Sequence, residues 1–238
     1  MESRLASALL VFLLALSAVL SGCLSQPTVE GGGFSFFLQA SDNWRLSALE
    51  VEPSQPNGRG IVLLHALGGV KEDWLPAAEF LAGKGFHVVA IDFRGHGRSA
   101  SPYAFESFSE RDFARLPLDA QAAVDYAFSA GDVKVTLVGA SIGANAALAT
   151  AASDSRVKAV ALLSPGLDYR GIDAVYYARS FSGRLLAFAA EGDEYSFKSG
   201  KEIASLSQSF EFIPLPGGAH GVKLAGEGVL ERIAELAG

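Results

Sequence analysis

The stretch Val133-Lys134-Val135-Thr136-Leu137-Val138-Gly139-Ala140-Ser141-Ile142-Gly143-Ala144 decides the fold of this chain. Its first six residues are largely apolar and β-branched, which is typical of a buried strand, and an alanine-rich helical segment follows over residues 142–152. Glycines two residues either side of Ser141 let strand and helix backbones approach where a side chain would clash. The stretch therefore predicts a sharp strand–turn–helix unit that presents a serine.

Short β-rich runs alternate with longer helical runs on both sides of this unit. Such alternation predicts an α/β fold, with a mostly parallel eight-stranded sheet and helices on both faces. The expected strands span residues 34–39, 44–51, 61–64, 86–91, 133–138, 157–163, 185–189 and 210–214. The first two are expected to form an antiparallel edge pair, whereas the continuous apolar runs of the others suit strands buried on both faces. Helices are expected over 74–83, 116–129, 142–152, 200–207 and 227–236.

Composition limits the class of protein. The formal net charge is -7 and no cluster of lysine or arginine appears, so the electrostatic footprint of a nucleic-acid-binding protein is missing and no nucleic-acid partner is expected. Cys23 is the only cysteine, which excludes an intramolecular disulfide and leaves packing to hold the fold. The chain length suits one sizeable α/β domain.

The N-terminus carries the pattern of an export signal. Arg4 precedes an uncharged apolar run over residues 5–20, and small residues follow it, as in signal peptides. The tetrad Leu20-Ser21-Gly22-Cys23 resembles the lipobox of prokaryotic lipoproteins, which implies cleavage before Cys23 and lipidation of that residue. A transmembrane anchor and a non-lipidated secretory signal are the alternatives, although an anchor needs about 20 apolar residues. We expect a signal peptide over 1–22, a lipidated cysteine with a flexible glycine-rich tether over 23–33, and a folded domain over 34–238, anchored on the extracytoplasmic side of a prokaryotic membrane.

A serine presented on such a turn needs a base and an orienting acid to act as a nucleophile. His220 is the only histidine after Ser141 and follows the last expected strand, while Asp193 lies in the loop after the preceding strand. Because α/β sheets collect their sites at the carboxyl ends of strands, these three side chains are expected to meet there. Other carboxylates remain as candidates for the acid: Asp168, Asp173, Glu191 and Glu194.

The other histidines and the charged residues near them have expected structural roles. His65 and His96 lie in glycine-rich turns, where the imidazole is expected to hydrogen-bond the backbone. His87 begins a strand and is expected to lie at the surface or at an edge. Asp92 and Arg94 are expected to brace their loop.

Two further segments complete a family pattern: His65-Ala66-Leu67-Gly68-Gly69 and Asp92-Phe93-Arg94-Gly95-His96-Gly97-Arg98-Ser99. Together with the Ser141 turn and the His220 loop they occur in the order seen in the α/β-hydrolase family, which the chain closely resembles over residues 34–238. The resemblance implies that Ser141 is the nucleophile, Asp193 the triad acid and His220 the general base. It also implies that the backbone N–H groups of Leu67 and Ile142 form an oxyanion hole. One residue departs from the pattern, since Ala66 stands where the family usually has glycine, and a differently shaped turn is expected there.

These residues predict a serine hydrolase that acts on a small acyl substrate without a metal or organic cofactor. Carboxylic ester cleavage is the first expectation, and thioester, lactone and amide cleavage stay open. A non-catalytic, membrane-tethered binding or assembly module on the same fold is the alternative, because fold does not fix function. The connection over residues 164–184 is too short for a large cap, and its aromatic residues are expected either to line an acyl pocket or only to pack. Residues 99–115 are a second candidate flap.

Overall fold

The computed structural model describes residues 28–30 and 32–238. The expected signal peptide and Cys23 lie outside the described residues, as does most of the segment expected to be a tether. Within residues 28–30 and 32–238, no helix has both the length and the apolar character needed to cross a membrane.

The main sheet has nine strands among the described residues, in the order β1-β2-β3-β5-β4-β6-β7-β10-β11. Their bounds are β1 (Thr28–Glu30), β2 (Gly33–Gln39), β3 (Arg45–Val51), β4 (Arg59–Leu64), β5 (His87–Ile91), β6 (Lys134–Ala140), β7 (Ala159–Leu163), β10 (Arg184–Ala190) and β11 (Phe210–Leu215). The strands β1, β2 and β3 are antiparallel, and β3 also runs antiparallel to β5. All pairs from β5 to β11 are parallel. The eight expected strands are all present, and β1 extends the antiparallel edge by one.

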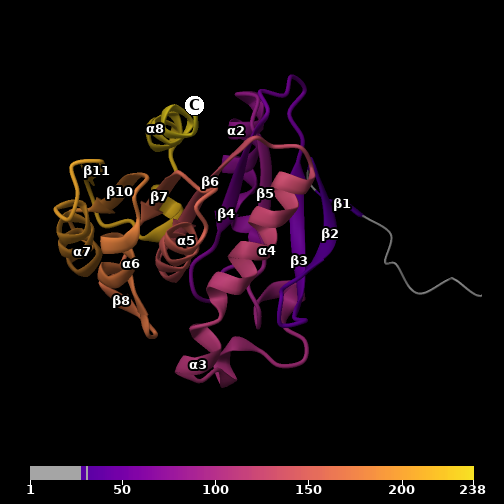
Figure 1. Cartoon of the computed structure of the whole chain (residues 1–238), viewed down its shortest axis with the longest axis horizontal. Coiled ribbons are helices and arrows are strands. Elements are labelled where there is room, and N and C mark those ends of the chain that lie inside the picture. Colours follow the sequence, from indigo (N-terminus) through magenta and orange to yellow (C-terminus); the bar gives the residue numbers. More distant parts are fainter. Residues whose placement is uncertain (1–27, 31) are drawn as a thin grey trace, which may run out of the picture.

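Helices cover both faces of this twisted sheet (Figure 1). They are α2 (Leu75–Gly83), α3 (Glu110–Phe113), α4 (Leu116–Ser129), α5 (Ile142–Ser153), α6 (Ala174–Ser180), α7 (Glu194–Ala204) and α8 (Glu227–Ala237). Alternate residues of β4 show how the faces divide: Val62 and Leu64 face the core under α4 and α5, whereas Ile61 and Leu63 face the core under α2 and α8. The expected mostly parallel α/β fold is confirmed.

The helix after β10 begins earlier in the chain than the sequence predicts. Helix α7 begins at Glu194, whereas residues 200–207 were expected. Gly200 lies inside α7, where a Cβ would come within 2.9 Å of the Phe212 ring. The earlier start matters for the site, since Asp193 then occupies the N-cap position of the helix.

The connection between β7 and β10 is short, as expected, and contains no large helical cap. It consists of a two-stranded hairpin, β8 (Asp168–Tyr169) and β9 (Ile172–Asp173), followed by α6. Asn145 on α5 anchors this connection, because its side-chain amide donates to the carbonyl oxygens of Gly166 at 3.0 Å and Ile172 at 2.8 Å. The hairpin is therefore fixed to the helix that follows Ser141.

Candidate active site

Ser141 stands on a strained turn between β6 and α5. Its backbone has φ 54° and ψ -121°, a conformation that costs about 1–3 kcal/mol in a non-glycine residue and persists only where the surroundings impose it. The amide of Ser141 donates to the carbonyl oxygen of Leu163 at 2.8 Å, which ties the turn to the end of β7. A Cβ on Gly143 would lie 2.5 Å from the carbonyl oxygen of His65, and one on Gly139 would overlap the carbonyl of Gly143. Both flanking positions therefore require glycine, for the close approach expected from the sequence.

Asp193 and His220 come together at the carboxyl edge of the sheet. The Asp193 Oδ2 lies 2.6 Å from the His220 Nδ1, with Asp193 on the loop after β10 and His220 on the loop after β11. The Asp193 side chain is largely covered, whereas the imidazole is 44% exposed and so can meet a ligand. The alternative carboxylates Asp168 and Asp173 have other partners, the amides of Gly171 and Tyr176.

The Ser141 hydroxyl is nearly buried and lies beside Tyr169 of the hairpin. Burial raises the pKa of Tyr169, and hydrogen bonding with Ser196 and Ser141 opposes that shift. In the part of the chain that the structure describes, no hydrogen bond joins the Ser141 hydroxyl to His220. Such bonds are often long in ligand-free enzymes and shorten when substrate binds. Tyr169 is therefore the hairpin residue whose hydroxyl faces the Ser141 hydroxyl.

The Asp193 carboxylate bonds His220, and the hydroxyls of Ser196 and Ser164 face it. Although burial opposes its charge, these three neighbours hold the pKa of Asp193 below its ordinary value. Ser196 also lies 3.3 Å from the Tyr169 hydroxyl. Asp193 is consequently ionised at neutral pH and held from several sides.

The turn after β4 is closed by a backbone hydrogen bond. The carbonyl oxygen of Ala66 accepts from the amide of Gly69 at 2.9 Å, and Gly68 has φ 74°, which together describe a type II turn. The positive φ falls on Gly68, so an alanine at position 66 fits without strain. Within the described residues, the amides of Leu67 and Ile142 take part in no hydrogen bond, so both are free to donate. A cleft of about 490 Å³ lies beside this turn, lined by Leu67, Asp73, His220, Val222 and Lys223 among others.

Two histidines support this turn as expected. The His65 Nε2 accepts from the amide of Phe93 at 2.9 Å, and its Nδ1 lies 2.7 Å from the carbonyl oxygen of Ala66. Burial and the neighbouring His96 lower the pKa of His65 to about 3, so it is a neutral backbone brace. His96 bonds the carbonyl oxygen of Arg94 at 2.9 Å.

Asp92 and Arg94 brace the loop after β5. The Asp92 carboxylate accepts from the amides of Lys71 at 2.8 Å and Arg98 at 2.9 Å. The buried Arg94 guanidinium forms bidentate ion pairs with Asp42 and Asp119, a geometry that arginine matches and lysine does not. These contacts join the sheet edge to α4, which confirms their expected structural role.

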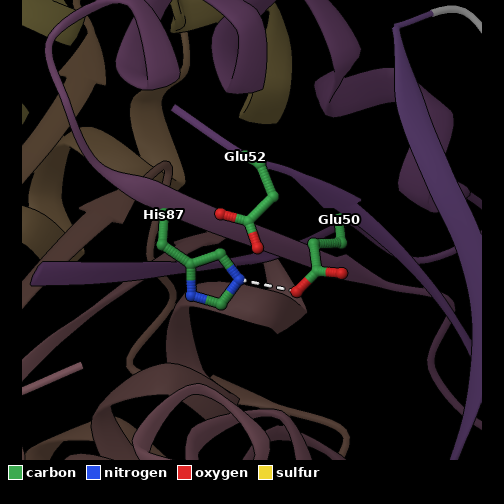
Figure 2. A group of neighbouring side chains, drawn as sticks. All are labelled: Glu50, Glu52 and His87. Carbon is green, nitrogen blue, oxygen red and sulfur yellow. Dashed lines mark hydrogen bonds and ion pairs between the residues drawn. The ribbon is translucent and has the colours of Figure 1, made fainter. Parts of the chain in front are cut away.

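The expectation for His87 is wrong, because this residue is buried between two carboxylates. Its Nδ1 lies 2.6 Å from Asp132. Its Nε2 lies 2.8 Å from Glu50, the contact drawn in Figure 2. Burial opposes the charge, yet the two carboxylates raise the pKa of His87 to about 10. Glu50, Glu52 and His87 have ligand atoms within 4.8 Å of one another, a spacing that can hold a metal ion. Both ring nitrogens of His87 already face carboxylates, so ion pairing accounts for the cluster, which lies at the opposite end of the parallel strands from Ser141.

Sequence reasoning missed Ser164 and Ser196 and left the role of Tyr169 open between lining a pocket and packing. A signal for Ser196 was available, since it lies three residues after Asp193 and a helix start between them would bring the two together. Ser164 follows the expected strand 157–163 and so belongs to the same sheet edge as Ser141, Asp193 and His220.

Comparison with known proteins identifies the family. The model of the "Alpha/beta hydrolase family" matches residues 61–228, and the chain belongs to this family. It is 35% identical over 118 residues to epoxide hydrolase A of Mycobacterium tuberculosis, covering 48% of this chain and 34% of that protein. It is 36% identical over 64 residues to the (E)-2-((N-methylformamido)methylene)succinate hydrolase of Acinetobacter baylyi, covering 27% and 22%. The chain thus matches a minor part of the length of these curated relatives.

Solved structures share the fold over most of their length. The Pyrococcus furiosus esterase Pf2001 superposes with a TM-score of 0.70 at 17% identity, covering 86% of this chain and 91% of that one. Dienelactone hydrolase from Anabaena variabilis superposes with a TM-score of 0.70 at 21% identity, covering 89% and 95%. At these identities the likeness concerns the fold.

Proposed function

We propose that this protein is a serine hydrolase that cleaves a carboxylic ester of a small substrate through an acyl-enzyme on Ser141. The observation that carries the proposal is the strained Ser141 turn at the same sheet edge as the 2.6 Å pair of Asp193 and His220. A strained, nearly buried serine next to an acid–histidine pair is the arrangement that nucleophilic catalysis needs.

The first half of the reaction forms the acyl-enzyme. His220 takes the hydroxyl proton as the Ser141 oxygen attacks the ester carbonyl carbon, and the carbonyl π electrons move onto oxygen. Asp193 holds the proton on the other imidazole nitrogen and stabilises the imidazolium. The amides of Leu67 and Ile142 donate to the oxyanion, and each such donor typically contributes about 3 kcal/mol to lowering the barrier. The intermediate then expels the alkoxide, which receives the proton from His220.

The second half repeats the chemistry with water. Water gives a proton to His220 and attacks the acyl carbon, and collapse of the second tetrahedral intermediate returns the proton to the Ser141 oxygen. None of these steps requires a cofactor. Thioester, lactone and amide substrates pass through the same intermediates, so they stay alternatives to the ester.

A fluorophosphonate probe tests this proposal directly. Wild-type protein should be labelled covalently and should hydrolyse short acyl esters, whereas Ser141→Ala should lose both because the nucleophile is gone. Ser153→Ala, at the far end of the same helix, is the matched control and should behave like wild type. Labelling of Ser141→Ala at the wild-type rate would place the nucleophile elsewhere, and an unlabelled, inactive wild type would favour the non-catalytic binding module.

We also propose that the protein is exported and anchored by lipid on Cys23, with residues 34–238 as the hydrolase domain. The lipobox-like tetrad ending at Cys23 supports this proposal, and two or more acyl chains give stable anchoring where one is marginal. A fatty-acid label should enter the wild-type protein in a lipoprotein-processing host, and Cys23→Ala should be unlabelled. A wild-type protein without label would refute the anchor.

A further inference from the structure

Ser164 lies where the three loops of the proposed triad meet. It directly follows β7, and the preceding residue, Leu163, accepts a hydrogen bond from the amide of Ser141 at 2.8 Å. Its own amide donates to the carbonyl oxygen of Phe188 on β10 at 2.8 Å, the strand that leads to Asp193. Ser164 itself is fully buried, so no part of it is accessible from solvent.

The hydroxyl of Ser164 reaches the two other loops. Its oxygen accepts from the amide of Gly221, the residue after His220, at 3.0 Å. The hydroxyl also faces the Asp193 carboxylate, whose pKa it helps to lower. Because an ionised carboxylate only accepts and the Gly221 amide only donates, the single hydroxyl proton is directed to Asp193 and a lone pair to Gly221.

The backbone of Ser164 is strained. Its φ is 53°, a left-handed conformation that glycine adopts freely and serine does not. A glycine would relieve this strain and retain the backbone contacts to β10. What serine has and glycine lacks is the hydroxyl, which lies between Asp193 and the loop that carries His220. Strained residues of this kind gather where the surrounding structure and function impose them.

We propose that Ser164 is a positioning residue for the triad, whose hydroxyl couples the Asp193 carboxylate to the backbone that carries His220. This inference rests on the proposed serine hydrolase function. Ser164 acts through its neighbours, since it is buried and does not line the cleft beside His220. Ser196 also faces Asp193, but its hydroxyl lies 3.3 Å from the Tyr169 hydroxyl of the hairpin, so it does not replace the link to the His220 loop.

Two substitutions at this position test the proposal by steady-state kinetics on a short acyl ester. Ser164→Ala removes the hydroxyl and keeps the strain, whereas Ser164→Gly removes the hydroxyl and relieves the strain. Both should lower kcat about 10- to 100-fold, the loss typical for a hydrogen bond to a charged group. KM should stay within about twofold because no cleft contact changes.

The pH profile separates a positioning role from a merely structural one. Asp193 is faced by the charge of His220 and by the hydroxyls of Ser196 and Ser164. Loss of one donor raises the pKa of this carboxyl. The less stabilised carboxylate then attracts the imidazolium form of His220 more strongly, and this protonated form cannot accept the serine proton. The acidic limb of kcat should therefore move to higher pH in both variants, and thermal unfolding should show that Ser164→Gly is folded.

Matched controls isolate the hydroxyl and the backbone. Ser47→Ala removes another fully buried serine hydroxyl, one without a hydrogen-bond partner, and Asn43→Gly introduces glycine at another left-handed position, with φ 67°. Both should retain wild-type kinetics. Two results with an active wild type would overturn this inference and leave the proposed function standing. One is a folded, fully active Ser164→Gly, and the other is a Ser164 variant whose pH profile matches that of wild type. An inactive wild type would overturn the proposed function and this inference with it.

Discussion

Gly143→Ala should damage activity through a steric clash that can be read from the structure. Gly143 is the second residue of α5, directly after Ile142, whose amide is one of the two proposed oxyanion donors. A Cβ at position 143 would lie 2.5 Å from the carbonyl oxygen of His65 and 2.6 Å from that of Leu64. Ordinary contacts of this kind begin near 3.4 Å, so the start of the helix must move by nearly 1 Å.

Such a displacement should lower both the catalytic rate and the stability of the fold. A misplacement of about 1 Å in an active site can lower the rate roughly 100-fold, and the loss of one oxyanion donor lowers kcat about 100- to 1,000-fold. Gly143→Ala should therefore lower kcat on a short acyl ester by about 100-fold or more. Overpacking of this kind should also cost about 1–3 kcal/mol of unfolding free energy.

The assay pairs this variant with Gly228→Ala on α8, where an added Cβ meets nothing within 4 Å. The control should keep full activity and gain up to about 1 kcal/mol of stability from the helical preference of alanine. Urea unfolding and ester kinetics measure both quantities. Wild-type kcat in a folded Gly143→Ala would refute the reasoning that close approach at this turn places the Ile142 amide.

Three further predictions concern charged groups. Asp193→Asn should lower turnover by about 10⁴-fold with little change in folding, as misassignment of the histidine tautomer does in serine proteases; near-wild-type turnover, with collapse in Asp168→Asn instead, would move the acid to the hairpin. Hydrolysis by the wild type should also fall at acidic pH, because protonated His220 cannot accept the serine proton. His87, with its pKa raised from 6.5 to about 10, should contribute stability that is complete below pH 6.5 and lost as the pH rises through 10, with a slope of at most about 1.4 kcal/mol per pH unit. Urea unfolding between pH 6 and 10 should therefore show a steeper decline for wild type than for His87→Gln, and parallel curves would contradict the ion-paired assignment.

Local sequence determined the Ser141 turn and the strands around it. The apolar run before Gly139 buries on both faces of a parallel sheet, and the glycines at 139 and 143 are the only residues that fit the approach of β6 and α5. The chain order of the proposed nucleophile, acid and base places each after a parallel strand, so their arrival at one sheet edge followed from strand direction. Asp193 and His220 accordingly meet at 2.6 Å, as the pattern predicted.

Tertiary structure decided the contacts that cross between elements. The sequence predicts that His87 is a surface or edge residue. Nothing near it in the chain indicates that Glu50 on antiparallel β3 and Asp132 before β6 lie against its ring nitrogens in the fold. Ser164 is likewise ordinary in sequence, and its link between Asp193 and Gly221 depends on β7 lying next to β10 in the sheet. Hydrophobic periodicity records which face of a strand is buried, but it carries no information on which distant polar group meets a side chain once the strands have paired.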